Sequence, residues 1–170
     1  MIEPHVILVD EKDNVLGTLS KLEVHAKGLL HRAISVFLFD DEGNWIIQQR
    51  ALNKYHSAGL WTNTCCSHPN YNETVIDAAN RRLMEEMGVE CELNFVFKLL
   101  YRTELDNELV EHELDHVFIG FTNQLPKPNV DEVKTWKLMS FLEIHQDVQN
   151  NPDHYTEWFK LLYQKVNLFL

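Results

Sequence analysis

The residues best able to do chemistry lie in one stretch, residues 61–89. Cys66 and His68 are two residues apart, so on a short strand their thiol and imidazole share a face. In the helix predicted next, Arg82 and Glu86 are four residues apart and lie on one stripe. A thiol, an imidazole, a guanidinium and a carboxylate thus converge, and the other candidate residues are interpreted as their partners.

Three histidines are candidate metal ligands: His25, His31 and His68. Neutral imidazoles bind transition metals well, and carboxylates complete such sites. Taken singly, each histidine is explained as readily by a structural or solvent-facing role, so the metal interpretation depends on shared partners. Four further histidines are interpreted as surface or loop residues without a function: His5, His56, His145 and His154.

The carboxylate partners are Glu111 and Glu113 in the segment V-E-H-E-L-D. On a strand they point to one face, where two carboxylates repel unless a cation, a proton or solvent relieves them. An exposed polar strand face explains the pattern equally well, and Asp115 continues that face. Three histidines with two glutamates would instead form a five-ligand site suited to Zn²⁺, Mn²⁺ or Mg²⁺.

Cys65 and Cys66 are neighbours on the same predicted strand, so only one of them can enter a given site. A buried cysteine is usually a small hydrophobic residue. A metal-bound or protonated His68 would, however, lower the pKa of the Cys66 thiol and make it reactive. Both interpretations of Cys66 stay open on the pattern alone.

Four basic residues could hold an anion: Lys21, Arg50, Lys54 and Arg82. Arg82 and Glu86 could form only a surface ion pair, worth roughly 0.2–0.5 kcal/mol. Alternatively, Arg82 holds a phosphate directly, which suits its bidentate and permanently charged fork. Glu86 would then reach the same phosphate through Mg²⁺.

The length of 170 residues predicts a single domain, 1–170, large enough to bury a core. The net charge of −11 argues against a nucleic-acid partner, which would require a basic face. No apolar run approaches the ~20 residues of a membrane span, so we expect no membrane partner. The N-terminus lacks the features of a signal peptide and the cysteine count is odd, so we expect a cytoplasmic protein without disulfides. A monomer or a homodimer is expected.

The secondary-structure pattern places strands before and after one clear helix. Strands are predicted at 5–9, 15–18, 33–39, 45–50, 92–103 and 108–122. A helix is predicted from Glu73, with apolar residues from Val75 to Met87 at helical spacing and Gly88 as its C-terminal cap, and further helices are predicted at 141–149 and 153–167. Residues 20–30 and 51–59 are interpreted as irregular. This order predicts an α+β fold, an α/β/α sandwich around a mixed sheet.

The run S-x5-E-x7-R-R-L-x-E-E-x-G-V resembles the Nudix box, usually G-x5-E-x7-R-E-U-x-E-E-x-G-U with U aliphatic. Ser67 replaces the usual Gly, and Arg82 replaces a Glu that normally binds the metals of pyrophosphate hydrolysis. The surrounding T-N-T-C-C-S-H-P, the H-x5-H pair and the E-x-E strand resemble type 1 isopentenyl-diphosphate Δ-isomerases, a family with the Nudix fold. The resemblance covers roughly residues 3–165.

The resemblance implies interconversion of isopentenyl and dimethylallyl diphosphate by metal-dependent protonation and deprotonation of the alkene. Cys66 and Glu113 would be the catalytic groups on opposite faces of the substrate, with Tyr101 beside Glu113. Trp158 would close over the hydrocarbon tail, although periodicity alone places it in the core. The Zn²⁺, Mn²⁺ or Mg²⁺ ligands would be His25, His31, His68, Glu111 and Glu113. The diphosphate would be held by Lys21, Arg50, Lys54, Arg82 and, through Mg²⁺, Glu86.

The partner implied is a small isoprenoid diphosphate, with no flavin or nucleotide cofactor. The alternative is a Nudix diphosphohydrolase acting on a nucleotide or another diphosphate, which would need an acidic metal cluster where Arg82 stands. A third class, a non-catalytic metal-stabilised binding module, explains the His/Glu set. It gives no reason for Cys66, Tyr101 and the basic residues to gather beside that set.

Overall fold

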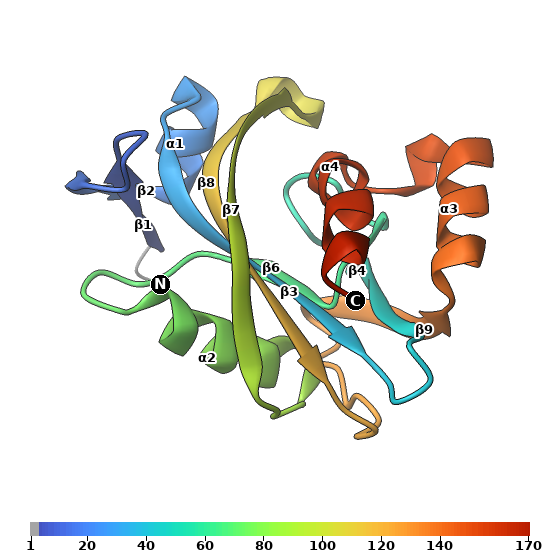
Figure 1. Ribbon diagram of the computed structural model, residues 1–170. Coiled ribbons are helices and arrows are strands. Elements are labelled where there is room, and N and C mark those ends of the chain that lie inside the picture. The colour runs from blue at the N-terminus through green and yellow to red at the C-terminus, as the bar shows by residue number, and fades with distance from the viewer. Residues whose placement is uncertain (1–3) are drawn as a thin grey trace.

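The structure, a computed structural model, describes residues 4–170 (Figure 1). The predicted domain limits of 1–170 include residues 1–3, which lie outside the described residues. The strands are β1 (His5–Val9), β2 (Val15–Ser20), β3 (His31–Phe39), β4 (Trp45–Arg50), β5 (Trp61–Thr62), β6 (Cys65–Ser67), β7 (Leu93–Glu104), β8 (Val110–Phe121) and β9 (Val133–Met139). The helices are α1 (Lys21–Lys27), α2 (Val75–Met87), α3 (Phe141–Asn150) and α4 (Glu157–Val166), with 3-10 turns η1 (Asp106–Glu108), η2 (Pro152–His154) and η3 (Asn167–Phe169).

Strand β3 is the hub of the sheet, since it pairs with β1, β4, β6 and β8. Its pairing with β8 is parallel and the other three are antiparallel, so the sheet is mixed, as predicted. The parallel register sets His31 beside Glu113. None of the helices in residues 4–170 is long and apolar enough to cross a membrane.

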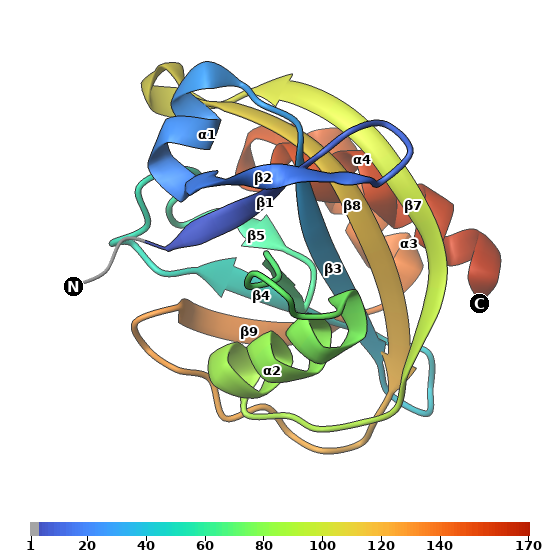
Figure 2. The ribbon, with the colours of Figure 1, turned by 90° about the vertical axis from the view of Figure 1, so that its left-hand side faces the viewer.

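The two faces of β3 are covered by different helices, which makes the predicted α/β/α sandwich. Ile34, Val36 and Leu38 pack with residues of α2, whereas Phe37 and Phe39 pack with residues of α3 and α4. The alternation follows from the two-residue period of a strand. Figures 1 and 2 show α2 on one side of the sheet and the two C-terminal helices on the other.

Helix α2 ends at the predicted cap, Gly88, but begins at Val75, two residues after the predicted start. The Thr74 hydroxyl accepts the backbone N–H of Asp77, and the N–H of Gly88 donates to the Met84 carbonyl. Gly88 has a φ of 61°, and a Cβ there would lie 2.7 Å from the Lys127 carbonyl oxygen. Glycine is therefore required both by the left-handed backbone and by the close approach of the neighbouring loop.

The prediction of an irregular segment at 20–30 was wrong, because α1 forms there. The Ser20 hydroxyl accepts the Glu23 N–H, and Gly28 ends the helix in the left-handed conformation. With seven residues, of which Val24 and His25 are buried, α1 is too short to show an apolar repeat. The sequence analysis also left strand β9 unassigned. Only Val133 of this strand is fully buried where β9 pairs with β4, so β9 too lacks a clear apolar repeat.

Asp13, in the turn between β1 and β2, ties three distant segments together. Its carboxylate accepts hydrogen bonds from Arg32 Nε at 2.7 Å, Lys98 Nζ at 2.6 Å and His116 Nε2 at 2.9 Å. Burial alone would raise the pKa of Asp13, but these donors outweigh it and lower the pKa to about 2. The ionised carboxylate is therefore favoured by folding.

We expect Asp13→Asn to lower the free energy of unfolding at pH 7. A carboxyl whose pKa falls on folding contributes stability above its unfolded pKa of about 3.9, and that contribution disappears as the pH drops toward about 2. The difference between wild type and variant should therefore shrink over that window, as measured by urea unfolding at a series of pH values. A difference that is constant with pH would contradict the assignment. Asn tolerates the φ of 71° at this position, which limits backbone effects.

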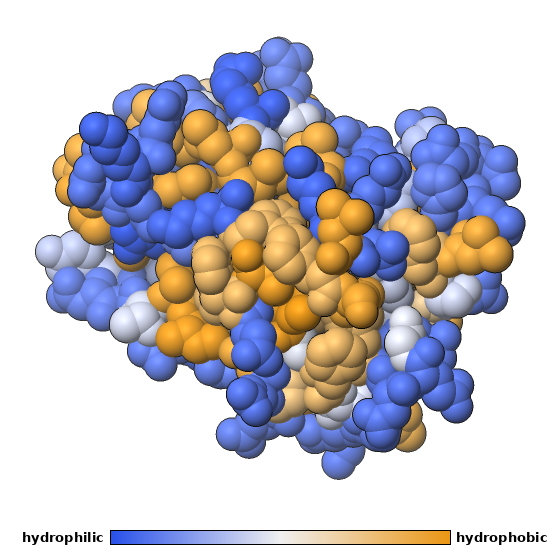
Figure 3. All heavy atoms as spheres, in the orientation of Figure 1, coloured by the Kyte–Doolittle hydropathy of each residue, from blue (hydrophilic) through white to orange (hydrophobic). Residues whose placement is uncertain are grey.

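Apolar side chains gather on the face that β7 crosses (Figure 3). Phe95 and Leu100 of β7 are exposed, and Phe97 stacks on Phe169 with ring centroids 5.3 Å apart. Within the described chain β7 pairs only with β8, so its outer edge is free. This face lies apart from the residues that the sequence analysis assigned to the site.

Candidate active site

Four of the five predicted metal ligands form one cluster. His25 comes from α1, His31 from the start of β3, His68 from the residue after β6, and Glu113 from β8. One ligand atom from each lies within 4.8 Å of the others. Glu113 Oε1 is 3.0 Å from His68 Nε2 and 3.4 Å from His31 Nε2. The cluster depends on the β3–β8 register, which sets His31 beside Glu113.

The ring nitrogens of this cluster are arranged as in a metal site. Nδ1 of His25 lies 2.7 Å from the Lys21 carbonyl and Nδ1 of His31 lies 2.9 Å from the Leu29 carbonyl. A carbonyl only accepts, so both Nδ1 atoms carry the proton and both Nε2 atoms have a free lone pair. Within residues 4–170 these two buried Nε2 atoms have no hydrogen-bond partner. Burial also lowers the pKa of His25 to about 4 and of His68 to about 3, which keeps both neutral. This donor set fits a divalent metal.

Glu111, the fifth predicted ligand, lies beside the cluster and not within it. Its carboxylate groups instead with His25 and His56. The Tyr101 hydroxyl connects the two glutamates, at 2.5 Å from Glu113 Oε2 and 3.2 Å from Glu111 Oε2. Tyr101 is there because β7 and β8 pair with Tyr101 opposite Glu113.

The two glutamates differ in the ease with which they ionise. Burial, and then the charge of Glu113, raise the pKa of Glu111 well above its ordinary range. Burial opposes the ionisation of Glu113 as well, but the close contacts of its carboxylate with the imidazoles of His31 and His68 outweigh it and hold its pKa low. The pair therefore resists carrying two negative charges unless a cation accompanies it.

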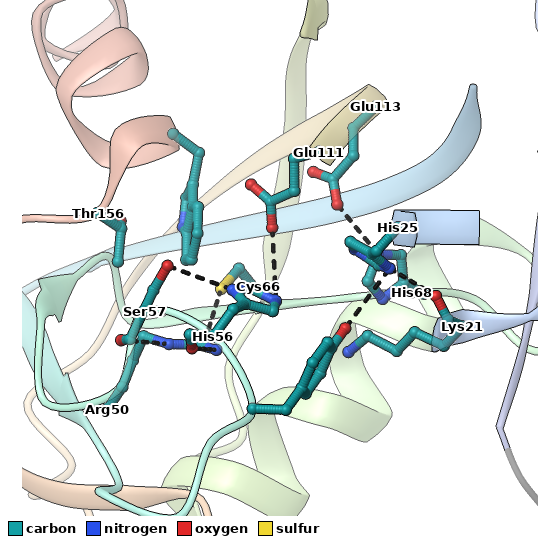
Figure 4. A network of polar contacts seen from close by, with 12 residues as sticks. Lys21, His25, Arg50, His56, Ser57, Cys66, His68, Glu111, Glu113 and Thr156 are labelled. Carbon is teal, nitrogen blue, oxygen red and sulfur yellow. Dashed lines mark hydrogen bonds and ion pairs between the residues drawn. The ribbon is translucent and has the colours of Figure 1, made fainter. Parts of the chain in front are cut away.

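Cys66 lies in a small cavity of about 30 Å³ whose lining includes Glu111, Glu113 and Trp158 (Figure 4). Burial raises the pKa of the Cys66 thiol to about 12, although the charge of Arg50 opposes the rise. The thiol is therefore protonated at neutral pH. Cys65 points the other way, into the core beside α2.

The four predicted diphosphate residues line a cavity of about 210 Å³, and Lys21, Lys54 and Arg82 also line one of about 220 Å³. Both share Lys21 and Ser67 with the small cavity at Cys66. A volume of about 30 Å³ corresponds to roughly one water, so the larger cavities are the natural place for an anionic group. The predicted residues thus come together.

These cations are, however, partly neutralised. Arg82 contacts Glu85 Oε2 and Glu86 Oε1, each at 2.7 Å, and Glu132 at 3.3 Å. Lys54 also pairs with Glu132. The prediction of a simple basic island is therefore corrected, because carboxylates from α2 and from the loop before β9 alternate with the cations.

Most of the hydrogen-bonding capacity of the Arg50 guanidinium is used within the protein. Its Nε donates to the Ser57 carbonyl at 3.1 Å and its Nη2 to the His56 carbonyl at 3.2 Å. Nη1 lies 4.0 Å from Cys66 Sγ, and the guanidinium carbon lies 5.2 Å from the centroid of the Trp158 ring. Arg50 therefore connects the loop after β4 with the thiol.

Trp158 is both buried among other side chains and exposed to the cavity at Cys66, so its position is compatible with a core role and with a role in the site. It is 3% exposed in α4, and its Nε1 donates to Asn63 Oδ1 at 3.2 Å. Its ring nevertheless lines the cavity at Cys66. Trp158 is therefore buried, as its periodicity predicted, and it also lines the cavity where the resemblance would place the substrate.

The sequence analysis missed His56, which it interpreted as a loop residue without a function. Its ring is 3% exposed and lines the same cavity as Cys66. Burial, reinforced by the charges of Arg50 and Lys21, lowers the pKa of His56 to about 2. Its position two residues after Lys54, in a segment predicted to be irregular, was the one sequence feature that connected it to the site.

Comparison with known proteins gives one consistent family. The NUDIX domain family model matches residues 29–159. The chain is 49% identical over 161 residues to a Pectobacterium atrosepticum protein named isopentenyl-diphosphate Delta-isomerase, covering 95% of this chain and 90% of that one. It is 50% identical over 155 residues to isopentenyl-diphosphate Delta-isomerase 2 of Photorhabdus laumondii, covering 91% and 88%.

Solved structures agree on the fold. The crystal structure of DR0079 from Deinococcus radiodurans superposes with a TM-score of 0.78 at 15% identity, covering 94% of this chain and 98% of that one. The MutT protein from Methanosarcina mazei superposes with a TM-score of 0.67 at 16% identity, covering 81% and 93%. At such identities the likeness extends to the fold alone.

Proposed function

Because the chain belongs to the isopentenyl-diphosphate Delta-isomerase family, with a NUDIX domain, we propose that it interconverts isopentenyl and dimethylallyl diphosphate. We propose further that Cys66 and Glu113 transfer the two protons. The observation that carries this assignment is that the thiol and the carboxylate line one cavity from two strands, β6 and β8.

The reaction moves a double bond that has no activating neighbour. A proton added to C4 forms a new C–H bond and leaves a tertiary cation at C3. Loss of a proton from C2 then forms the C2–C3 double bond, so no electrons enter or leave. The site therefore needs an acid, a base and protection of the cation from water.

The residues at the cavity meet these needs. Cys66 is a protonated thiol, and Glu113 is a carboxylate whose Oε2 accepts a hydrogen bond from Tyr101 at 2.5 Å. Tyr101 is thereby placed to pass a proton to or from Glu113. Glu113 is 6% exposed and Trp158 is 3% exposed, so water is largely excluded. The face of an indole ring stabilises a nearby cation by roughly 2 kcal/mol in a dry site.

The residues His25, His31, His68 and Glu113 would hold a divalent metal, Zn²⁺, Mn²⁺ or Mg²⁺. Glu111, which lies beside this cluster, would become a fifth ligand by turning its carboxylate toward the ion. Such an ion supplies positive charge that lets both glutamates ionise and tunes the acidity of groups bonded to them. The protein contributes the orientation: carbonyls of Lys21 and Leu29 fix the tautomers of His25 and His31.

The diphosphate takes no part in bond making and serves to position the alkene. Lys21, Lys54 and Arg82 surround the larger cavities where it would bind. Glu86 and Glu132 lie among these cations, so an anion bound there would meet like charges. A Mg²⁺ ion accompanying the diphosphate would relieve that repulsion at Glu86, where Gln48 already orients the carboxylate at 3.1 Å.

The Nudix box residue Arg82 favours isomerisation over hydrolysis. A Nudix diphosphohydrolase would need an acidic metal cluster on α2, but the Arg82 guanidinium forms ion pairs with Glu85 and Glu86 there. We also propose that the chain acts as one domain in the cytoplasm, as a monomer or homodimer, without flavin or nucleotide cofactor.

Incubation with isopentenyl diphosphate in D2O tests the reaction class. The metal-replete protein should yield dimethylallyl diphosphate with deuterium in its new methyl group, observed by NMR, and should release no phosphate. Phosphate release from a panel of nucleotide diphosphates, with isopentenyl diphosphate unchanged, would instead identify a hydrolase. A heat-inactivated sample controls for uncatalysed exchange.

A further inference from the structure

His56 occupies a position that the proposed reaction does not yet use. Its Nε2 lies 3.9 Å from Glu111 Oε1, and the ring stacks on His25 with centroids 5.6 Å apart at 30°. Figure 4 shows His56 between Cys66 and Glu111, inside the cavity. The ring is enclosed on other sides by Tyr55 at 4.5 Å and by Trp158 at 6.1 Å, both edge to face.

The loop that carries His56 is held from two directions. Arg50 donates to the carbonyls of His56 and Ser57 from the end of β4. From η1, Asp106 Oδ1 accepts the Ser57 N–H at 3.1 Å and Asn107 Nδ2 donates to the Tyr55 carbonyl at 3.1 Å. The backbone around His56 is thus fixed at three consecutive residues.

Ser57 adds backbone strain to this arrangement. Its φ of 50° is left-handed, a conformation that is unfavourable for residues other than glycine, asparagine or aspartate. The Ser57 hydroxyl lies 3.2 Å from His56 Nδ1, so the same residue that turns the chain also contacts the ring. A loop that served only to connect β4 and β5 would not require this conformation at a serine.

The second group of possible metal donors, His25, His56 and Glu111, cannot be filled together with the four-residue cluster. His25 has one free lone pair, at Nε2, because its Nδ1 proton is donated to the Lys21 carbonyl. That lone pair belongs with the larger cluster, where three further donors meet it. His56 Nε2 is then left facing Glu111 Oε1, a group that accepts hydrogen bonds.

We propose that His56 is a positioning residue that hydrogen-bonds Glu111 through Nε2–H and so orients this carboxylate toward the metal cluster. The 3.9 Å separation is longer than a hydrogen bond, so the proposed bond requires the Glu111 carboxylate to move closer to His56, whose backbone is held. Tyr101 holds the other oxygen of Glu111 at 3.2 Å. Glu111 would then be held through both of its oxygens, one by Tyr101 and the other by His56. The inference rests on the proposed metal site.

The affinity of the purified full-length protein for Mn²⁺ tests this role without any substrate. Loss of an outer-shell partner typically weakens metal binding by about 10–100-fold, and we expect that loss in His56→Phe, which keeps an aromatic ring. His56→Gln, whose amide nitrogen can replace Nε2 as donor, should recover most of the affinity. Free Mn²⁺ is followed by its EPR signal in competition with a chelator. His145→Gln, on α3, is the matched control and should bind as the wild type does.

A double-mutant cycle with Glu111→Gln separates positioning from general damage. If His56 acts through Glu111, His56→Phe should have no further effect on Mn²⁺ affinity in the Glu111→Gln background. Wild-type Mn²⁺ affinity in His56→Phe, or equal and additive losses in the two backgrounds, would overturn the proposal. Thermal unfolding of each variant establishes that it is folded. Because no substrate is present, failure of the isomerase assignment would show only in the D2O experiment.

Discussion

Replacing Cys66 with alanine is expected to lower kcat for isomerisation by about 10²–10⁴-fold, the usual contribution of a positioned acid or base. The thiol is protonated and lines the same cavity as Glu113, from β6 where Glu113 comes from β8. Its loss leaves Glu113 to act alone, and one group cannot serve both faces of the alkene in a closed site. The measurement is conversion of isopentenyl diphosphate under saturating substrate.

Cys65→Ala is the matched control for this experiment. It removes the same thiol one residue earlier, but from the core cluster beneath α2. We expect wild-type kcat within a few-fold and a lower thermal stability, since a buried side chain is shortened. A Cys66→Ala protein with near-full isomerase activity would refute the assignment. Metal content should be unchanged in both variants, because Cys66 is not in the His/Glu cluster.

Glu113→Gln should abolish activity by two routes at once. Its carboxylate lies within reach of His31 and His68 in the metal cluster, and its other oxygen accepts from Tyr101. An amide has no negative charge for the metal and cannot accept the substrate proton. We expect kcat to fall by about 10²–10⁴-fold and metal content to fall in the same preparation, as measured by elemental analysis.

The two routes separate when excess metal is added. Glu111→Gln, which loses only a proposed ligand, should regain activity at saturating Mn²⁺, whereas Glu113→Gln should not. Asp115→Asn is the control on the same strand face; its carboxylate accepts from Ser35 at 2.7 Å, outside the cluster. Full recovery of Glu113→Gln by metal would restrict Glu113 to a ligand role and contradict its part in proton transfer.

Elements with a strong period were predictable from sequence. Helix α2 was predicted to within two residues of its observed ends because its apolar residues recur every three or four positions and Gly88 marks its C-terminus. Strands β7 and β8 were placed within two residues of their observed ends. Helix α1 was missed because seven residues carry too little periodicity, and its end caps alone did not reveal it.

In the candidate site, local pattern related only residues that share a strand or a helix, and the family resemblance supplied the other proposed partners. Glu111 and Glu113 follow from the alternation of β8, and Arg82 and Glu86 from the turn of α2. His56 was missed because its position depends on contacts of its loop with other elements. Arg50 lies at the end of β4, and Asp106 lies in η1, far along the chain. Likewise, no pattern predicted that Glu132 would lie between Lys54 and Arg82.

Glu132, which pairs with two of the cations proposed to bind the diphosphate, affects the rate at which an anionic substrate would associate. Lys54 and Arg82 are already partnered by Glu132, and the chain as a whole has a net charge of −11. A protein with this charge distribution offers little long-range attraction to an anion, so electrostatic steering cannot accelerate encounter. If Lys54 and Arg82 bind the diphosphate as proposed, phosphate oxygens would have to replace Glu132 at the two cations. The same carboxylate, returning to its partners, would help expel the product diphosphate.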